Sequence, residues 1–246
     1  MCFICSNCLL NAHIEKGKET LNNLIIAKCD MLDPSVLKAS EALDELIYEC
    51  TSCKAKKAKF SLLSMYTLSG THTSFYYYGT DHLITNVIQY IKKGLENNEI
   101  IYLTMVEGIY NRLIGSLESL GIPTKNIFFA DVSELILEHK HNSLKGLKEK
   151  IDFYQKDSYS KGFKSIRWIG QPTFAITHAS EMDFLNWEKD LNTALKDTNI
   201  SLLCVYDFYD YMNGKGIINT NVINESYLTH PTMMYKFNVV SLIDKI

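Results

Sequence analysis

The sequence predicts an α/β protein, in which an N-terminal antiparallel two-helix hairpin precedes a three-layer domain with a mainly parallel sheet. Two segments before residue 51 carry apolar residues at helical spacing and are separated by a short break. After about residue 70, short apolar runs alternate with helical segments, as in a parallel sheet covered on both faces. The chain has 246 residues, 46% of them hydrophobic, enough for one large and one small domain. We expect the hairpin at 1–53, a charged linker at 54–69 and the larger domain at 70–246.

The hairpin is predicted from two apolar stripes and the break between them. Asp33 suits a helix N-cap, and Pro34 suits the first helical position because its missing N–H would have no partner there. The stripe of the first helix is Ile14, Leu21, Leu24 and Ile25, and that of the second is Val36, Leu37, Leu43, Leu46, Ile47 and Cys50. Helices joined by so short a turn pack antiparallel. A hairpin of this size is marginal alone in water, so it needs a staple or a larger domain.

The larger domain is predicted from the order of its strands and helices. Its strands are short, apolar and rich in β-branched and aromatic residues, as buried parallel strands are. They are expected at 74–78, 100–104, 127–130, 166–169 and 200–206, with a last one at 233–240. Helices are expected from Thr80 or Asp81, at about 109–120 and 143–159, and at 181–195. Gly121 and Pro123 end the second of these helices.

Composition and missing motifs exclude several classes of function. The net charge of −3 gives no bulk attraction to nucleic acid, and no apolar run reaches the ~18 residues of a membrane span. The first residues have neither the basic region nor the apolar region of a signal peptide, so we expect a soluble cytoplasmic protein without membrane or nucleic-acid partners. Neither a G-x-x-x-x-G-K-[ST] motif nor a G-x-G-x-x-G motif after a strand is present, so no nucleotide is expected.

Cysteines at both ends of the hairpin indicate a metal site. Cys2, Cys5 and Cys8 are spaced by three, and Cys50 and Cys53 repeat that spacing. A cytosolic protein does not keep structural disulfides, so such pairs favour thiolate ligands. The antiparallel hairpin would bring Cys5, Cys8, Cys50 and Cys53 together as a tetrahedral zinc site. An iron–sulfur cluster using Cys2 is the alternative, as is a terminus with reduced thiols and no metal.

The second helix carries the short motif Ser40-Glu41-Ala42-Leu43-Asp44. With it, residues 14–47 resemble the Spo-zero-E-like sporulation aspartyl-phosphate phosphatases, whose motif at these positions is Ser-Gln-Glu-Leu-Asp. The other matching positions are Ile14, Glu15, Leu21, Leu24, Ile25, Leu32, Asp33, Pro34, Val36, Leu37 and Ile47. The resemblance implies a two-helix hairpin that removes the phosphoryl group from an aspartate of a sporulation response regulator.

The chemistry of that reaction suits the residues on the second helix. An acyl phosphate is already activated, so the protein need only orient a water in line and tolerate the developing charge. Ser40 and Asp44 share one helix face at i and i+4, with Glu41 beside them, and we expect these three as catalytic residues with Asp44 facing solvent. An ordinary solvated face is the alternative. Glu41 in place of glutamine also keeps open docking without hydrolysis.

From His72 almost to its end, the chain carries a long ordered set of segments. They contain His72, Thr73, Ser74, Phe75, Tyr76, Tyr90, Ile91, Lys92, Lys93, Gly94, Leu95, Glu99, Gly121, Gly162, Arg167, Gly170, Gln171, Trp187, Glu188, Cys204, Val205, Tyr206, Asp207, His230 and Pro231. These segments resemble the MEDS domain, the DcmR-type sensory domain of methanogens and methylotrophs. Within the matched stretch, Gln171, Phe174 and Val205 replace the residues usual in the family. The resemblance implies a RecA-like fold that has lost its phosphate-binding loop, and a sensory role.

Several of these residues fall where an open α/β sheet places ligands, at the carboxyl ends of its strands. We expect one pocket at a single edge of the sheet for an unknown small-molecule or protein signal. Its expected residues are His72, Tyr76, Arg167, Gln171, Glu188, Tyr206, Asp207 and His230. Each also has a local structural interpretation, such as a buried arginine–acid pair.

Together the two parts predict a two-component signalling regulator. We expect it to dephosphorylate the aspartyl phosphate of a response regulator under the control of its sensory domain. One alternative is a non-catalytic protein that docks on a response regulator, and another is a metal or redox sensor that uses the cysteine cluster.

Overall fold

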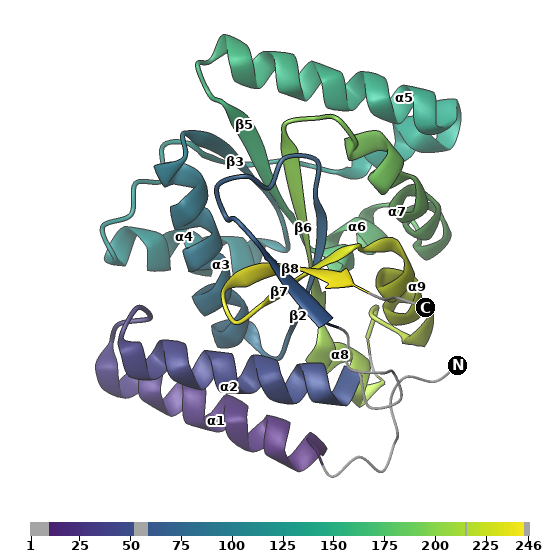
Figure 1. The fold of residues 1–246 in the computed structure, drawn as a ribbon. Helices are drawn as coiled ribbons and strands as arrows, with labels where there is room; N and C mark the ends of the chain where they lie inside the picture. Colours follow the sequence, from purple (N-terminus) through teal and green to yellow (C-terminus); the bar gives the residue numbers. More distant parts are fainter. Residues whose placement is uncertain (1–9, 52–58, 215, 244–246) are drawn as a thin grey trace.

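The computed structural model describes residues 10–51, 59–214 and 216–243. It has the predicted α/β fold: a helical hairpin at one end of a larger domain built on an eight-stranded sheet (Figure 1). The hairpin consists of α1 (Leu10–Lys28) and α2 (Pro34–Thr51). Their buried side chains close the hairpin, and a Cβ at Gly17 would meet Leu43 Cδ1 at 3.3 Å. The predicted antiparallel hairpin is thus confirmed.

The sheet is mixed and mostly parallel. Its strands are β1 (Lys59–Leu63), β2 (His72–Tyr77), β3 (Glu99–Thr104), β4 (Ile127–Phe129), β5 (Ser165–Gly170), β6 (Ile200–Asp207), β7 (Thr232–Tyr235) and β8 (Asn238–Ile243). They are arranged in the order β1-β8-β7-β2-β6-β5-β3-β4. The strands from β7 to β4 pair in parallel, whereas β8 is antiparallel to both β7 and β1. The mainly parallel sheet predicted from alternating strands and helices is confirmed.

Helices cover both faces of the sheet and give the predicted three layers. One face buries α3 (Thr80–Glu96) and α4 (Glu107–Ser119). The other buries α5 (Ser133–Ser160), α6 (Pro172–His178), α7 (Glu181–Leu195), α8 (Phe208–Asn213) and α9 (Thr220–Thr229). Parity along each strand decides the face, because successive side chains point to opposite sides. Tyr76 therefore shares a core with α7 and α9, while its neighbour Tyr77 shares one with α3.

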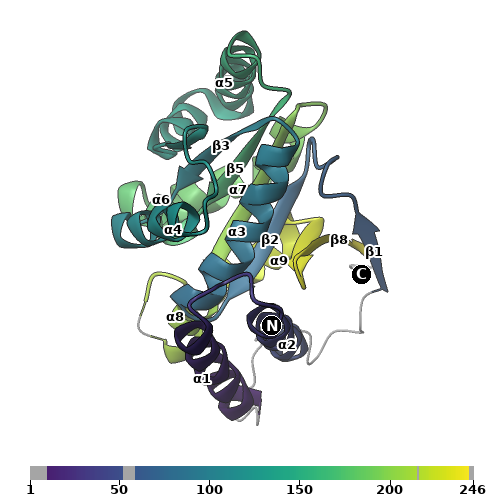
Figure 2. The same ribbon diagram turned by 90° about the vertical axis from the view of Figure 1, so that its left-hand side faces the viewer.

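Two segments differ from the sequence prediction. Residues 59–63, expected in a linker, form β1 at the sheet edge (Figure 2). Residues 233–240, expected as one strand, fold as β7, a two-residue turn and β8. Lys236 and Phe237 form that turn with φ of 49° and 59°. Positive φ at both positions favours Asn-Gly or Asp-Gly, so a Lys-Phe pair carries no sequence signal of a turn.

Candidate functional site

The face of α2 that carries Ser40 and Asp44 lies against the larger domain. Ser40 is 0% exposed and Asp44 is 4% exposed. The prediction of a solvent-facing Asp44 is therefore wrong. The reason is tertiary: polar residues at the start of α3 and in the β7–β8 turn complement this face. Glu41, the third expected catalytic residue, is half-buried.

Asp44 has a partner for each of its carboxylate oxygens. Its Oδ2 accepts a hydrogen bond of 2.8 Å from the backbone N–H of Lys236. Its Oδ1 lies 3.0 Å from Nε2 of His82, an electrostatic contact whose alignment falls short of a hydrogen bond. The other ring nitrogen of His82 accepts the backbone N–H of Tyr78 at 3.1 Å, so a neutral ring carries its proton on Nε2. The polar edge of His82 thus faces the carboxylate.

Ser40 repeats this arrangement one helical turn away. Its Oγ accepts a hydrogen bond of 2.9 Å from Nδ2 of Asn86, whose amide also donates to His82 O. His82 and Asn86 are four residues apart on α3, as Ser40 and Asp44 are on α2. Residues at this spacing share a helix face. The two helices therefore meet through two matched polar pairs, which we call the Ser40–Asp44 contact.

The first helix adds a second attachment of the hairpin. The Tyr78 hydroxyl donates to Oε1 of Glu15 at 2.5 Å. Burial and this carboxylate raise the pKa of Tyr78, so the hydroxyl keeps the proton that it donates. Lys18 lies over the ring of Tyr209, with its ammonium 4.4 Å from the ring centre, and its alkyl chain covers Gly79. These contacts fix α1 beside the carboxyl end of β2.

A second site lies inside the larger domain, on the sheet face covered by α7 and α9. It contains His72 at the start of β2, Cys204 in β6, Glu188 in α7 and His230 between α9 and β7. All four side chains are at least 97% buried. Their donor atoms lie within 4.8 Å of one another, and this group has the donor types that could hold a metal ion.

The electrostatics of this cluster are dominated by burial. Burial raises the pKa of Glu188 to about 7, and it raises the pKa of Cys204 well above its ordinary value, with the Glu188 carboxyl adding to that shift. Glu188 also accepts a hydrogen bond of 3.3 Å from Oγ1 of Thr229. Burial therefore favours the uncharged form of both side chains, and a positive charge in the cluster would favour the charged forms.

Two family models match the chain. Residues 71–231 match MEDS, the methanogen/methylotroph, DcmR sensory domain. This match covers more than half of the chain. The chain belongs to the MEDS family. Residues 10–51 match the Spo0E-like sporulation regulatory proteins, so the α1–α2 hairpin is a Spo0E-like domain. No curated protein matches the chain.

The MEDS domain brings five of the eight predicted ligand residues to one sheet face. His72, Glu188 and His230 meet in the cluster, and the Tyr206 ring lies edge-on to His230 with centroids 5.6 Å apart. Tyr76 stacks on Tyr206 at 5.6 Å. Cys204, the fourth residue of the cluster, was not among the residues expected in the pocket. Its position could have indicated this role, because Cys204 and Tyr206 are two residues apart on one strand and so point to the same face of the sheet.

The other three predicted ligand residues are not part of this cluster. The expectation of one shared pocket is wrong for Arg167 and Asp207, whereas Gln171 lines an apolar cavity next to Cys204. Arg167 is on the α3 face, where it pairs with Glu99 and donates to Tyr90 O at 2.8 Å. Gln171 donates to the Tyr77 hydroxyl at 3.0 Å, and that hydroxyl donates to Asp207 at 3.2 Å. Arg167 lies on the α3 face because successive side chains of a strand point to opposite faces, and its neighbour Trp168 lies on the cluster face. The ligand-binding roles of these residues stay predictions.

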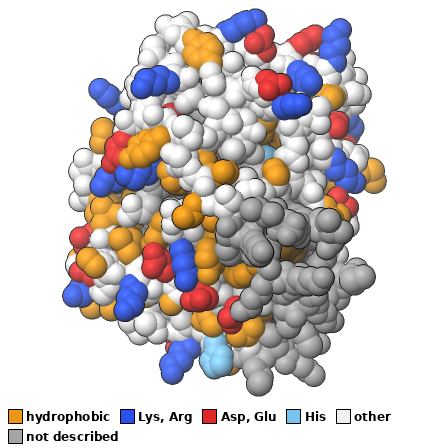
Figure 3. Space-filling model, in the orientation of Figure 1, with side chains coloured by type: hydrophobic (Ala, Val, Ile, Leu, Met, Phe, Trp, Pro, Cys, Tyr) orange, Lys and Arg blue, Asp and Glu red, His pale blue; other side chains and the backbone are white. Residues whose placement is uncertain are grey.

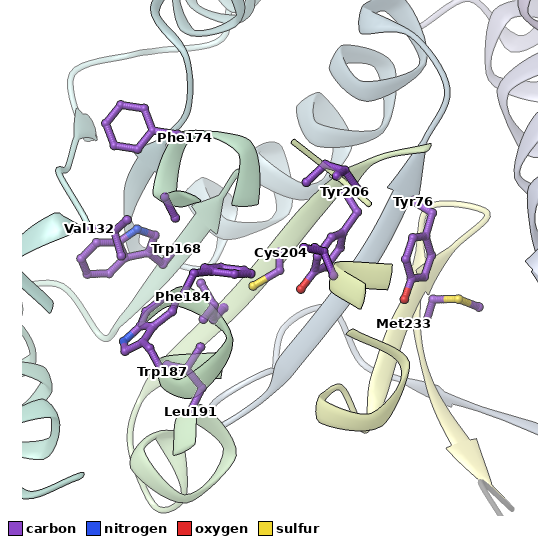
Figure 4. Close-up of a cluster of buried hydrophobic side chains, with 14 of the residues drawn as sticks. Tyr76, Val132, Trp168, Phe174, Phe184, Trp187, Leu191, Cys204, Tyr206 and Met233 are labelled. Carbon is purple, nitrogen blue, oxygen red and sulfur yellow. The ribbon is translucent and has the colours of Figure 1, made fainter. Parts of the chain in front are cut away.

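An apolar cavity of about 40 Å³ adjoins the cluster. Trp168, Phe184, Trp187 and Leu191 line it, and Cys204 lies at the boundary between cavity and cluster. Figure 4 shows Cys204 between this aromatic group and Tyr206. The cavity has room for a small apolar group beside the thiol.

The predicted cysteine site falls mostly outside the described residues. Cys5, Cys8 and Cys53 belong to the segments that the structure does not describe, and Cys50 is buried near the end of α2. Zinc at these four cysteines stays a prediction. Within the described ranges, every helix is too short or too polar to cross a membrane. Acidic and basic side chains are interspersed over the face seen in Figure 3.

Proposed function

We propose that this protein is a signalling regulator whose hairpin removes the phosphoryl group from the aspartyl phosphate of a sporulation-type response regulator. The MEDS domain would control that activity. The match of residues 10–51 to the Spo0E-like family supports the hairpin's role, and the match of residues 71–231 supports the sensory role. The proposed partner is the phosphorylated response regulator.

In this proposal Asp44 and Ser40 act on the attacking water. The Asp44 carboxylate accepts a hydrogen bond from the water, and Ser40 adds a polar group one turn away on the same face. Because an acyl phosphate is already activated, orienting water in line supplies most of what the reaction needs. Asp44, Ser40 and Glu41 would then touch substrate or water, and catalysis would need no metal held by the hairpin.

The observation that supports control by the MEDS domain is the burial of these groups in the Ser40–Asp44 contact. An aspartyl phosphate on another protein has no access to a side chain that is 4% exposed and paired with His82 and Lys236. In this proposal the described conformation is a closed one of low activity. The hairpin would have to leave α3 to act, so control would lie in the MEDS residues that contact it. Each polar pair contributes about 0.5–1.5 kcal/mol. Apolar side chains of the hairpin also share a core cluster with Tyr76 and Tyr78, so a bound signal would have to offset both kinds of contact.

A small-molecule signal has a candidate location in the apolar cavity beside Cys204. The cavity is lined by α7 and β6, and β6 pairs with β2 along its length. β2 leads directly to Tyr78 and α3, which grip the hairpin. A ligand that alters the β2–β6 pair would therefore act on the elements that hold the hairpin.

Phosphate release from a phosphorylated response regulator tests the enzyme assignment. Asp44→Ala should abolish most release, although it also removes the carboxylate that His82 and Lys236 hold and so should loosen the hairpin. A loosened yet inactive hairpin would separate the catalytic role of Asp44 from its docking role. Glu49→Ala, an exposed change on the same helix, is the matched control and should leave the rate unchanged. Undiminished release by Asp44→Ala would remove this face from catalysis.

The second candidate is a protein that docks on a response regulator without hydrolysis. Glu41 favours it, because the family has glutamine here and a carboxylate adds negative charge near an acidic phosphorylation site. Glu41→Gln restores the family motif and should hold or raise the rate of release. Binding of the phosphorylated regulator with no release by either Glu41→Gln or the parent protein would establish the docking role instead.

The cysteine ligands are a separate part of the proposal. Zinc bound by Cys5, Cys8, Cys50 and Cys53 would staple the two ends of the hairpin. Metal analysis of aerobic and anaerobic preparations distinguishes zinc from an iron–sulfur cluster. Chelation should loosen the hairpin and leave the MEDS fold in place, and unchanged melting of the hairpin after metal removal would contradict this.

A further inference from the structure

We propose that the MEDS domain of this protein binds one zinc ion through His72, Glu188, Cys204 and His230. This site is separate from the four N-terminal cysteines and from the face of α2. Its ligands come from two neighbouring strands, a helix and the segment before β7. Since these elements meet only in the folded domain, the site is assembled by the fold.

Distances among the donor atoms fit tetrahedral coordination. With bonds of about 2.0–2.1 Å to nitrogen and oxygen and about 2.3 Å to sulfur, neighbouring donors in a tetrahedron lie about 3.3–3.6 Å apart. Cys204 Sγ lies 3.5 Å from His72 Nε2 and 3.5 Å from Glu188 Oε1. Glu188 Oε2 lies 3.5 Å from His72 Nε2 and 3.7 Å from His230 Nε2. The four donors together lie within 4.8 Å of one another, so the more distant donors would move inward to enclose an ion.

The chemistry of the donors favours zinc over magnesium and calcium. One thiolate, two imidazoles and one carboxylate are borderline-soft ligands that suit zinc and disfavour magnesium and calcium, which prefer oxygen. A thiolate and a carboxylate together carry two negative charges, which one divalent cation balances. In a site at least 97% buried, that balance offsets the large cost of burying either charge alone.

Neighbouring groups orient the ligands as they do in other metal sites. Nδ1 of His230 lies 2.8 Å from the backbone carbonyl of Ser226, a geometry that places the proton on Nδ1 and leaves Nε2 as the donor toward the cluster. Thr229 Oγ1 donates to the Glu188 carboxylate. Four protein ligands complete the coordination and leave no open position, so the ion would have a structural role rather than activate a water.

The test uses the full chain with Cys5, Cys8 and Cys53 replaced by serine, so that the proposed hairpin site cannot contribute. After stripping with a chelator and adding zinc or cobalt, this protein should bind one ion per chain. Cobalt should give tetrahedral d–d bands and a thiolate-to-cobalt charge-transfer band. Absence of bound zinc and of these bands would overturn the proposal, whatever any further variant does.

Three additional substitutions locate the ion. Cys204→Ser should abolish the charge-transfer band and weaken zinc binding by at least about 10-fold, the lower end of what loss of a second-shell partner alone costs. Glu188→Gln keeps the side chain's shape and should weaken binding while the circular dichroism spectrum stays native-like. Cys29→Ser, which removes an exposed thiol, is the matched control and should change neither. Equal zinc affinity and equal spectra for Cys204→Ser and Cys29→Ser would overturn the site.

Discussion

Arg167 was expected to bind a ligand, but its position along β5 directs its side chain to the opposite face of the sheet. Sequence reasoning grouped it with Glu188 and Asp207 as a ligand residue, yet its guanidinium is 0% exposed on the opposite sheet face, where Glu99 is its ion-pair partner. Its two amino groups donate to the backbone carbonyls of Tyr90 and Met65. This is the buried arginine–acid pair that was the alternative interpretation, and it supports the domain rather than a ligand.

Replacing Arg167 should therefore act on stability. Arg167→Met leaves the buried Glu99 carboxylate without its cation and should lower the free energy of unfolding by about 3–5 kcal/mol. Both tryptophans, Trp168 and Trp187, lie in the MEDS domain, so their fluorescence in a urea titration reports this transition. Arg112→Met breaks a half-exposed pair with Asp81 and should cost about 0–1 kcal/mol. Equal small losses for both variants would mean that Arg167 does not stabilise the fold.

Among the secondary-structure elements, α3 packs closely on the sheet and also contacts the hairpin through His82 and Asn86. Its close approach depends on Gly94, where an added Cβ would lie 2.9 Å from Arg167 Cδ and from Ile101 Cδ1. Gly94→Ala should lower the free energy of unfolding by about 1–3 kcal/mol through overpacking. Gly115 in α4 has open space around it, so Gly115→Ala should raise stability by about 0.5–1 kcal/mol. Urea titration of the two variants should give shifts of opposite sign, and shifts of the same sign would contradict this packing.

The β7–β8 turn is the second element that holds the hairpin. Lys236→Pro removes the N–H that Asp44 accepts and cannot adopt the observed φ of 49°. It should increase amide hydrogen exchange along α2. Lys236→Asn keeps the N–H and tolerates positive φ, so it should leave that exchange near the parent level. Equal exchange for the two variants would show that the turn contributes nothing to docking.

Across the whole molecule, the sequence predicts the elements and their order but not how the two domains meet. Helical and strand periodicity located α7 at its observed bounds and most strands of the sheet, because periodicity reflects local burial. The Ser40–Asp44 contact depends on His82, Asn86 and the Lys236 turn, which are far apart in the sequence. Only the assembled sheet brings them to one surface. A polar stripe on α2 has the same sequence pattern whether that helix face is exposed to water or packed against α3, so the sequence does not distinguish the two.

The buried cluster was predictable in part for the same reason. Family resemblance pointed to His72, Glu188 and His230, but a free cysteine is most often a small core residue, so Cys204 was not assigned to the site. The structure also relates the cluster to the hairpin. His72 begins β2 and His230 precedes β7, and those parallel strands lead to Tyr78 and Lys236 at their other ends.

Control of the hairpin by the MEDS domain is tested most directly by the rate of phosphate release after the MEDS residues that contact α2 are replaced. Asn86→Ala and His82→Ala leave Ser40, Glu41 and Asp44 intact but remove their partners on α3. Both variants should release phosphate from a phosphorylated response regulator faster than the parent protein, because the closed conformation loses its contacts. Lys92→Ala, an exposed change on the same helix, should leave the rate unchanged. A rate that stays the same or falls in both docking variants, with the fold intact, would contradict control of the hairpin by the MEDS domain.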